Sequence, residues 1–391
     1  MAPSMTYDAL IVGGGPGGLY AAWRLAQVGV RVVVCEEHQA VGVPVHCTGV
    51  LGADSFDEFE LPRETVLNPL PTIRFVSPTG LELRYTPPDV QAVVIDRGEF
   101  DGTLAEWARS CGAELRANAR VTALDITDTG VHAVAGGEAV SARVAILACG
   151  ASYALQRRFG LGLPRRYLHT AQRELPVRTL HDVEVHFGLE VAPGGFAWAV
   201  PVERPDGPYV RIGAMATYRA DHCYARMCGR LAAAWGLGDW KACGGPRLKI
   251  LPLGPIDRTF ADRLLVIGDA AGLVKPTTGG GIYYSIVSGS LAADVVQQGL
   301  ARKRLDAAFL STYEARWRGH LSSELKAQAA LREAAEAMSD HDIDALFDLA
   351  KTDGIMPIVR KTARFNQHRH LIRALFNHPP ARRVLFRAFA G

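Results

Sequence analysis

The chain has 391 residues, of which 48% are hydrophobic, and this length suits two or three packed domains with a substantial core. Its net charge of +3 is too small to indicate a nucleic-acid partner, and no apolar run approaches the roughly 18 residues of a membrane span. No charged and apolar leader opens the chain and its seven cysteines are scattered, so we expect a cytoplasmic protein with free thiols, without a disulfide framework or a metal site.

A nucleotide-binding unit is predicted in residues 7–36. A short apolar run, a glycine cluster, an amphipathic stretch and a second apolar run follow one another, which predicts strand, turn, helix and strand. Gly13, Gly15 and Gly18 have the G-x-G-x-x-G spacing, which allows a tight turn, close approach to a pyrophosphate and close helix packing. Glu36 ends the second strand, where a carboxylate can bind a ribose hydroxyl. The pattern predicts a dinucleotide site without choosing the dinucleotide.

The next segment, residues 38–50, is predicted to be a loop because of its glycine and proline content. It leaves the carboxyl end of the second strand, which is the edge where open α/β sheets bind ligands. Cys47 lies in this loop beside His46, so an activated thiolate is one interpretation. A small side chain packed where a ligand passes is the favoured alternative.

Two short strands over 72–76 and 81–85 interrupt the nucleotide unit and predict the start of a second sheet. A helix is predicted over 100–111, with Asp96 as its N-cap. Arg97 lies at the start of this helix, where the helix dipole favours anions over cations. It therefore either binds something negative or is solvated.

Residues 119–148 alternate between apolar and polar types, which predicts a three-stranded meander whose last strand returns to the parallel sheet. Residues 165–257 are rich in predicted strands, interrupted by one helix, and should form the substrate domain. Within them, alternation places Phe196, Trp198 and Val200 on one face. This apolar wall either packs in the core, which periodicity alone favours, or lines a pocket.

A second passage from strand through glycine turn to helix occupies residues 264–282 and continues as a helix to about residue 298. Its helix start offers backbone amides to an anion or a polar ring, and Asp269 can bind a ribityl hydroxyl. Two glycine-lined helix starts suit one long cofactor held at both ends. This favours FAD, with its pyrophosphate near Gly15 and its isoalloxazine near Gly279, Gly280, Gly281 and Ile282.

Helices are predicted from about residue 305 onward, and no acidic residue follows Asp353. Basic residues alternate with apolar ones here, a pattern typical both of helices that bind anionic membranes and of packed helices with a solvated face. Both interpretations stay open. The basic residues are Arg360, Lys361, Arg364, Arg369, Arg373, Arg382, Arg383 and Arg387.

These motifs together resemble the geranylgeranyl reductase family, within the larger group of flavoproteins with the p-hydroxybenzoate-hydroxylase fold. The likeness covers most of residues 5–300. Three motifs carry most of it: the Gly268–Ile282 stretch, the Pro-Val-His-Cys loop and the sequence Phe196-x-Trp198-x-Val200-Pro201. The last is similar to the family's Tyr-x-Trp-x-Phe-Pro motif, with Phe and Val in place of Tyr and Phe.

The resemblance implies an α/β fold, α+β in part. A Rossmann-type FAD-binding domain would carry an inserted antiparallel β-sheet substrate domain and a C-terminal helical region. The FAD-binding domain would comprise residues 1–69, 92–164 and 258–304. The substrate domain would comprise residues 70–91 and 165–257, and the helical region residues 305–391.

The resemblance also implies an enzyme with non-covalent FAD that reduces isolated double bonds of a polyprenyl chain. Hydride would pass from N5 of reduced flavin to one alkene carbon, and Cys47 or an ordered water would protonate the other. NADPH or a ferredoxin-like protein would supply electrons transiently. The substrate could be geranylgeranyl diphosphate or its chlorophyll ester, an ether lipid or a quinone tail, and the basic C-terminus suits either a diphosphate or a peripheral membrane site. The oligomeric state stays open.

By position, the resemblance implies two sets of contacts. FAD contacts fall on Gly17, Glu36, Cys47, Thr48, Val50, Arg97, Val121, Asp269, Gly281 and Ile282. The substrate chain would meet Phe196, Trp198, Val200 and Pro201.

Two other functions compete with this one. A flavin monooxygenase or halogenase has the same fold, and a halogenase motif Trp-x-Trp-x-Ile-Pro partly matches Phe196–Pro201. Halogenases also need an active-site lysine, whereas Lys275 lies in the predicted flavin loop and residues 1–190 contain no lysine. A non-enzymatic prenyl-lipid-binding protein is the third candidate, and the retained glycines, Arg97 and Asp269 argue against it.

Overall fold

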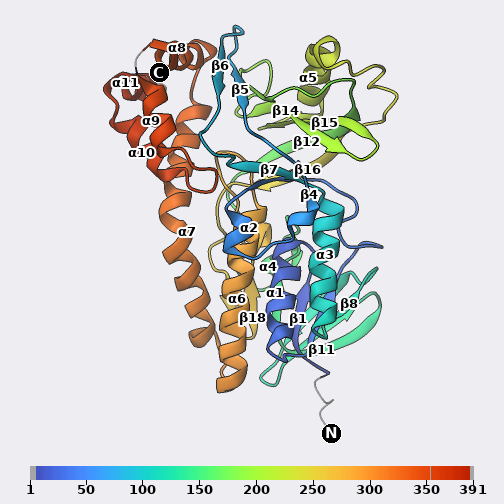
Figure 1. Cartoon of the computed structure of the whole chain (residues 1–391). Helices are drawn as coiled ribbons and strands as arrows, with labels where there is room; N and C mark the ends of the chain where they lie inside the picture. The colour runs from blue at the N-terminus through green and yellow to red at the C-terminus, as the bar shows by residue number, and fades with distance from the viewer. Residues whose placement is uncertain (1–5, 353, 388–391) are drawn as a thin grey trace. The chain divides into compact units, whose positions relative to one another are not determined.

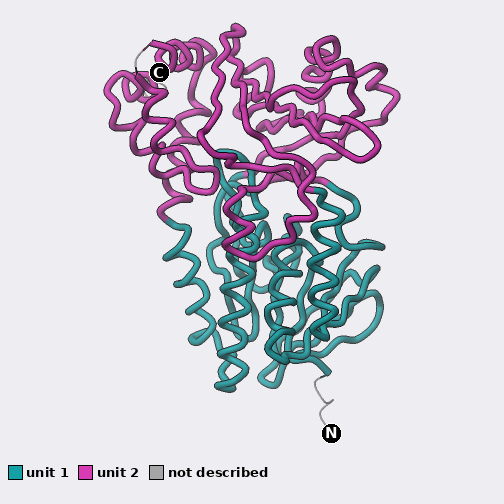
Figure 2. The backbone as a smooth tube through the Cα atoms, in the orientation of Figure 1, with its two compact units in different colours: residues 1–45, 96–166, 252–322 teal, residues 46–95, 167–251, 323–391 magenta. Residues whose placement is uncertain are grey.

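The computed structural model describes residues 6–352 and 354–387. The chain divides into two compact units, the first of residues 1–45, 96–166 and 252–322 and the second of residues 46–95, 167–251 and 323–391 (Figure 2). This division by contacts places residues 46–69 in the second unit, whereas we predicted them within the cofactor domain.

The first unit is built on a sheet whose central strands run parallel (Figure 1). β1 pairs in parallel with β2 and β11, and β18 continues this order beyond β11. Most residues of these strands are buried, which explains their continuous apolar sequences. In spatial order the strands are β17 (Phe260–Ala261), β18 (Leu264–Val266), β11 (Glu138–Leu147), β1 (Tyr7–Val12), β2 (Val32–Cys35) and β8 (Glu114–Arg116).

The predicted meander is confirmed. β9 (Val121–Ile126), β10 (Val131–Ala135) and β11 pair antiparallel in sequence order. β11 then extends beyond β10 and pairs in parallel with β1 and β18. One long strand thus joins the meander to the parallel sheet, as the apolar end of the segment indicated.

Helices complete the first unit. Helix α1 contacts both α3 and α6, and the rings of Trp23 and Trp107 lie 5.1 Å apart between α1 and α3. Helix α3 begins at Arg97, three residues before the predicted start, because Asp96 caps it. The helical segments are α1 (Pro16–Gln27), α3 (Arg97–Ser110), α4 (Ala154–Arg158), the 3-10 turn Gly268–Ala271, α6 (Ile282–Arg302) and the first half of α7 (Ala307–Glu336).

The second unit contains a seven-stranded sheet and a three-stranded sheet (Figure 1). The predicted strand pair near residues 72–85 joins the large sheet, where β5 pairs in parallel with β13. In spatial order the large sheet is β16 (Arg247–Pro252), β12 (Tyr167–Pro176), β15 (Gly207–Ala216), β14 (Phe196–Arg204), β13 (Val183–His186), β5 (Ile73–Val76) and β6 (Glu82–Tyr85). The small sheet is β3 (Val50–Gly52), β7 (Ala92–Ile95) and β4 (Val66–Pro69).

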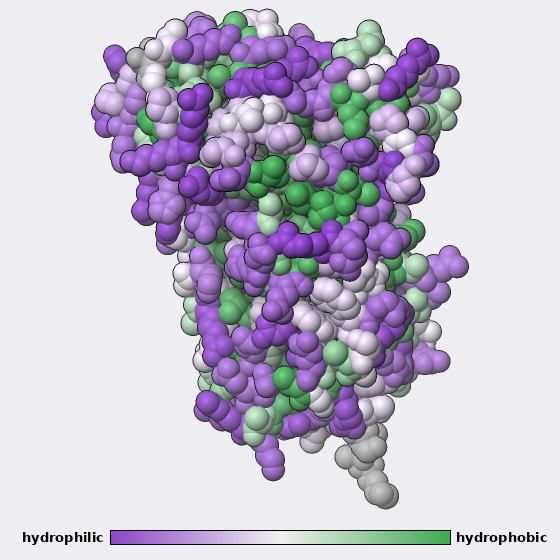
Figure 3. Space-filling model, in the orientation of Figure 1, coloured by the Kyte–Doolittle hydropathy of each residue, from purple (hydrophilic) through white to green (hydrophobic). Residues whose placement is uncertain are grey.

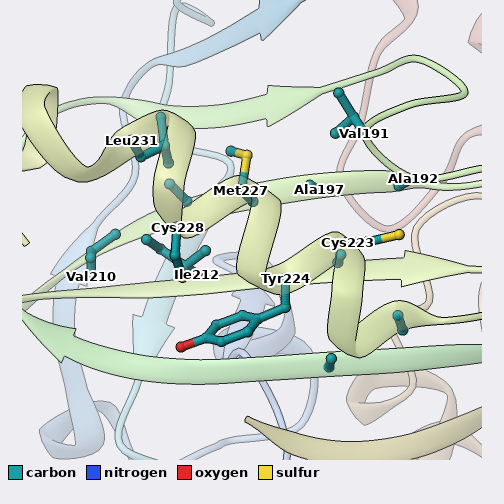
Figure 4. Close-up of a cluster of buried hydrophobic side chains, with 14 of the residues drawn as sticks. Val191, Ala192, Ala197, Val210, Ile212, Cys223, Tyr224, Met227, Cys228 and Leu231 are labelled. Carbon is teal, nitrogen blue, oxygen red and sulfur yellow. The ribbon is translucent and has the colours of Figure 1, made fainter. Parts of the chain in front are cut away.

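Helix α5 (Ala220–Trp235) covers one face of the large sheet with a continuous apolar side. Tyr224, Met227 and Leu231 point from this helix onto the strands, where Ile212 is also fully enclosed (Figure 4). This cluster is a core of ordinary composition and accounts for most of the helix's apolar residues. Two short segments, α2 (Ser55–Glu58) and the 3-10 turn Arg63–Thr65, lie between β3 and β4 in the chain.

Within residues 338–352 and 354–387, the structure has the helices α8 (Asp340–Thr352), α9 (Ile355–Thr362), α10 (Arg369–Asn377) and α11 (Pro379–Arg387). Their apolar residues Ile355, Ile372 and Leu385 are buried. Most of the cations are exposed, and hydrophilic side chains predominate over these helices in Figure 3; the Arg387 side chain lies outside the described part. In the described residues, no helix combines the length and apolarity needed to cross a bilayer.

A buried ionic network links the strands of the second unit to α5. The Glu184 carboxylate on β13 is 2% exposed and accepts hydrogen bonds from Arg74 Nη2 at 2.5 Å, His186 Nε2 at 2.7 Å and Trp235 Nε1 at 2.9 Å. Burial raises the pKa of this carboxyl, but the hydrogen bonds from His186, Arg74 and Trp235 outweigh burial and hold the pKa below its usual range.

We expect Glu184→Gln to lower the free energy of unfolding by about 3 kcal/mol at neutral pH, because it removes the charge that balances a buried network. The wild-type charge stabilises the fold above the unfolded-state pKa of about 4.3 and loses this effect as the pH falls through the lower folded-state value. The variant should therefore lose less stability than the wild type between pH 5 and pH 2. Urea denaturation across this range measures both effects.

Glu82→Gln is the matched control, because Glu82 binds the same Arg74 but is 54% exposed. It should change the unfolding free energy by less than about 1 kcal/mol. Equal pH profiles for the Glu184 and Glu82 variants would contradict the assigned role of Glu184.

Candidate functional site

The two glycine-rich helix starts predicted from the sequence lie together in the first unit. Helix α1 begins after Gly15 and helix α6 after Gly281. A Cβ atom on Gly17 would lie 2.6 Å from the carbonyl oxygen of Ser285, in the first turn of α6. A Cβ on Gly268 would lie 2.6 Å from the Ser285 hydroxyl. Ser285 therefore touches both glycine segments, although they are about 250 residues apart in sequence.

The glycines of the first turn serve different purposes. Gly13 has a φ of +109°, and a Cβ there would lie 2.4 Å from the carbonyl oxygen of Ala148. A Cβ on Gly18 would lie 2.4 Å from the carbonyl oxygen of Gly13. Gly15, in contrast, has open space around its Cβ position. Gly13 and Gly18 permit close packing, while Gly15 leaves room for a ligand at the helix start.

The electrostatics of both helix starts favour an anion. The N-cap residues of α1 and α6 are the glycines Gly15 and Gly281, which offer no capping side chain of their own, and no acidic residue lies in the first turn of either helix. The positive end of each helix dipole is thus not offset by a carboxylate within its own first turn. A phosphate or a polar ring oxygen is the type of group that such an end binds.

Glu36 is held at the end of β2, as predicted. Its Oε2 accepts a hydrogen bond from the Gly14 amide at 2.6 Å, and its Oε1 accepts one from the His38 amide at 3.0 Å. The carboxylate borders a cavity of about 250 Å³. Residues lining this cavity include Val34, Gln39, Val41, Ala105, Arg109, Leu115 and Arg116. The cavity lies between the end of β2, α3 and the end of β8, so the predicted ribose-binding carboxylate stands at its edge.

Asp269 lies at the other glycine segment. A Cβ on Gly281 would lie 2.7 Å from Asp269 Oδ1, so this carboxylate is beside the start of α6. The Tyr153 hydroxyl donates to the Asp269 carbonyl at 3.0 Å. Lys275, which follows in the loop, is 2% exposed. Its amide donates to the Gly280 carbonyl, and its carbonyl accepts from the Gly279 amide. These bonds close the loop that leads into α6.

Arg97 is paired within its own helix. Its Nε and Nη2 donate to the two carboxylate oxygens of Asp101 at 3.2 and 2.7 Å, and its side chain is 14% exposed. The interpretation of Arg97 as a solvated cation is therefore wrong. The predicted cap is confirmed, because Asp96 Oδ1 accepts from the amides of Gly98 and Glu99. Val121 opens β9 in the same unit.

The second unit contains the Cys47 loop. Cys47 is a half-buried free thiol, and its Sγ accepts a hydrogen bond from the Gly49 amide at 3.3 Å. The Thr48 hydroxyl donates to Gln172 Oε1 on β12 at 2.7 Å. Val50 begins β3 and packs in the same apolar cluster as Trp198 and Val200. The structure thus brings the loop and the predicted apolar wall into one neighbourhood of this unit.

The wall has the predicted alternation. Trp198 and Val200 lie in the cluster with Val50, while the intervening Ala197 and Ala199 lie beneath α5 on the other face. Phe196 is half-buried and its ring meets the Trp198 ring edge-on at 5.9 Å. Pro201 accepts a hydrogen bond from Asn68 Nδ2 through its carbonyl.

Trp198 depends on a glycine of the neighbouring strand. Gly213 on β15 is its cross-strand partner, and a Cβ there would lie 2.3 Å from the indole Cζ2. The indole therefore lies directly against the backbone of β15 at Gly213. Larger residues at position 213 would push the ring away from this place.

Comparisons with known proteins agree with this arrangement. A family model described as an NAD(P)-binding Rossmann-like domain matches residues 11–57. The digeranylgeranylglycerophospholipid reductase of Methanocaldococcus jannaschii is 30% identical over 87% of this chain and 89% of its own length. The chain belongs to the geranylgeranyl reductase family. A second relative, digeranylgeranylglycerophospholipid reductase 2 of Methanothermobacter thermautotrophicus, is 28% identical over 97% and 99%.

Solved structures agree on the fold of this geranylgeranyl reductase family member. A geranylgeranyl bacteriochlorophyll reductase-like protein from Thermoplasma acidophilum superimposes with a TM-score of 0.82 at 22% identity, covering 98% of this chain and 99% of that protein. The halogenase PltM superimposes with a TM-score of 0.69 at 16% identity, covering 97% and 85%. The predicted α/β fold with a Rossmann-type domain is confirmed. The chain is an enzyme of the flavin-dependent oxidoreductase class to which its family belongs.

Several residues that support the predicted ones carry little or no local sequence signal. Tyr153 contacts the Asp269 backbone, and Gln172 contacts the Thr48 side chain. Arg211 contacts the Thr48 backbone, and Gly213 lies against the Trp198 ring. Only Gly213 carried a signal, since a glycine inside a strand often marks a close approach. The others act over 116 to 163 residues of chain separation, which no local pattern reveals.

We expect Gly17→Ala to lower the free energy of unfolding by about 1–3 kcal/mol, because the added methyl group would press against the Ser285 carbonyl. Thermal unfolding followed by far-UV circular dichroism measures this change. Gly319→Ala is the control, since Gly319 lies exposed on α7 with open space at its Cβ position. That variant should gain up to about 1 kcal/mol from helix propensity. A stabilised Gly17→Ala protein would refute close packing of α1 on α6.

Proposed function

We propose that this protein is an FAD-dependent reductase that saturates carbon–carbon double bonds of a geranylgeranyl-type polyprenyl chain. The observation that carries the proposal is the pair of glycine-rich helix starts that meet at Ser285, in a chain whose relatives are named digeranylgeranylglycerophospholipid reductases. One long dinucleotide held at both ends suits this pair. The predicted FAD-binding and substrate-binding domains are part of the proposal.

The residues present fit FAD in several places. The open space at Gly15, before the uncapped start of α1, would receive the pyrophosphate. Glu36 would accept a hydrogen bond from a ribose hydroxyl, and Asp269 would bind the ribityl chain beside Gly281 and Ile282. Bound and reduced FAD supplies a hydride at its N5 atom. NADPH or a ferredoxin-like protein would bind transiently and supply the electrons.

The apolar wall would orient the substrate. An isolated alkene is unactivated, so its reduction depends on close positioning and on exclusion of water. Phe196 and Trp198 are half-buried aromatic side chains next to the buried Val200. Such a surface suits a flexible prenyl tail better than a compact polar substrate.

Cys47 is the proposed proton donor, with an ordered water as the alternative. The Cys47 Sγ atom already accepts a hydrogen bond from the Gly49 amide, so the S–H group remains able to donate its proton. In the reaction the S–H proton would pass to the alkene carbon that does not receive hydride. Solvent would then return a proton to sulfur.

The exposed cations of α9, α10 and α11 support a role in binding the charged part of the lipid. Arg360, Lys361, Arg373 and Arg382 are exposed on helices without acidic residues. A diphosphate, a phospholipid headgroup or a peripheral anionic membrane would each be attracted to them.

Under strictly anaerobic conditions, we expect the photoreduced enzyme to be reoxidised by a polyprenyl substrate. The flavin absorbance near 450 nm should recover, and the lipid should gain mass by one H₂ for every bond reduced. A monooxygenase or halogenase of the same fold would require oxygen for flavin turnover. Reoxidation by oxygen alone, across geranylgeranyl diphosphate, geranylgeranyl ether phospholipids and prenylquinones, would contradict the proposal.

We expect Cys47→Ala to lower kcat by about 10²-fold or more, because general acid catalysis typically contributes 10²–10⁴-fold. FAD content and KM for the lipid should change little. Stopped-flow absorbance during substrate reduction measures the effect. Cys243→Ala removes another half-buried thiol of the same unit and should retain full activity. Equal rates for the two variants would assign protonation to water.

A further inference from the structure

One buried arginine joins the Cys47 loop to the large sheet of the second unit. Arg211 lies on β15 and is 3% exposed. Its Nη1 donates to the Thr48 carbonyl at 2.6 Å and to the Ile95 carbonyl at 3.1 Å. The guanidinium therefore bridges the loop and the end of β7, two segments that are far apart in sequence.

Arg211 is balanced and oriented by Glu174 on β12. Its Nε donates to Glu174 Oε2 at 2.8 Å, and Arg204 Nε donates to Oε1 of the same carboxylate at 2.6 Å. Burial raises the pKa of Glu174, but the two guanidinium groups outweigh burial and hold the pKa below its usual range. Glu174 therefore remains charged near neutral pH and fixes the plane of the Arg211 fork.

Further hydrogen bonds hold the same loop. The Ile95 amide donates to the Gly49 carbonyl at 2.8 Å, and the Thr48 hydroxyl donates to Gln172 at 2.7 Å. Neither of these bonds reaches the Thr48 carbonyl, which Arg211 binds. Charge-assisted hydrogen bonds are the stronger type, so Arg211 makes the dominant contact to this peptide group.

We propose that Arg211 is a positioning residue for the reaction: it fixes the backbone at Thr48 and thereby sets the place of the neighbouring Cys47 thiol. This inference rests on the proposed function, in which Cys47 delivers the proton. The neighbours of Arg211 on β15, Val210 and Ile212, lie in the apolar core beneath α5. A buried arginine is rarely found without a partner, so packing alone does not explain residue 211. Its hydrogen-bonding fork instead ends on backbone atoms of the loop.

The test compares Arg211→Met with Arg204→Met in the full-length holoprotein. Both variants remove a guanidinium from Glu174, but only the first removes the bonds to Thr48 and Ile95. Hydrogen–deuterium exchange is followed in peptides covering residues 46–50, and iodoacetamide alkylation of Cys47 is read by peptide mass spectrometry. In Arg211→Met we expect both rates to rise by about tenfold or more, and in Arg204→Met by less than about twofold.

Kinetics separate positioning from general destabilisation. With dithionite-reduced enzyme and geranylgeranyl diphosphate, Arg211→Met should lower kcat by about tenfold or more with little change in KM. Arg211→Lys keeps the charge beside Glu174 but lacks the fork, so it should restore stability and only part of kcat. If Arg211→Met does not fold, the Arg211→Lys protein is compared with Arg204→Met by the same three measurements.

Loop exchange and Cys47 alkylation that are equal in the Arg211 and Arg204 variants would overturn the inference. So would a loosened loop with unchanged kcat. Failure of the wild-type enzyme to reduce any prenyl probe would refute the proposed function instead. The exchange and alkylation rates would still report whether Arg211 holds the loop.

Discussion

Close contact between helices α1 and α6 is the constraint on which the first unit depends. A Cβ on Gly289 would lie 2.4 Å from the Gly17 carbonyl, and one on Gly17 would lie 2.6 Å from the Ser285 carbonyl. The two helices can approach this closely only because side chains are missing at the contact. The first turns of the two helices consequently lie close together at this contact. The proposed cofactor site would thus depend on helix packing as much as on loop sequence.

The second unit is organised by buried charge. Glu184 secures β13 to α5 and β5, while Glu174 orients the guanidinium that holds the Cys47 loop. Glu184 is buried and the Glu174 side chain is 26% exposed, and both carboxylates are kept ionised by several donors. Apolar packing around Tyr224 and Met227 stabilises the large sheet beneath α5. The charged networks add directional hydrogen bonds between strands, α5 and the Cys47 loop to this apolar packing.

Local patterns predicted what local chemistry determines. The strand–glycine–helix unit, the Asp96 cap and the alternation through Trp198 could be predicted because each depends on residues within one element. Helix α6 runs to Arg302 rather than ending near Gln298, since helix ends depend on tertiary contacts. The partner of Arg97 was four residues away and could have been inferred from helical spacing. Arg211 could not, because its partners Thr48 and Ile95 become neighbours only after the sheets form.

The interleaving of the two units has a consequence for synthesis on the ribosome. The chain passes between them at residues 45/46, 95/96, 166/167, 251/252 and 322/323. Strand β11 can pair with its outer parallel neighbour, β18, only after residue 266 has been synthesised. Helix α1 can pack on α6 only later still, because α6 ends at Arg302. Until then the nascent chain exposes an unpaired strand edge and an apolar helix face. The yield of folded enzyme should therefore depend on how early these surfaces are protected, by a chaperone or by the meander itself.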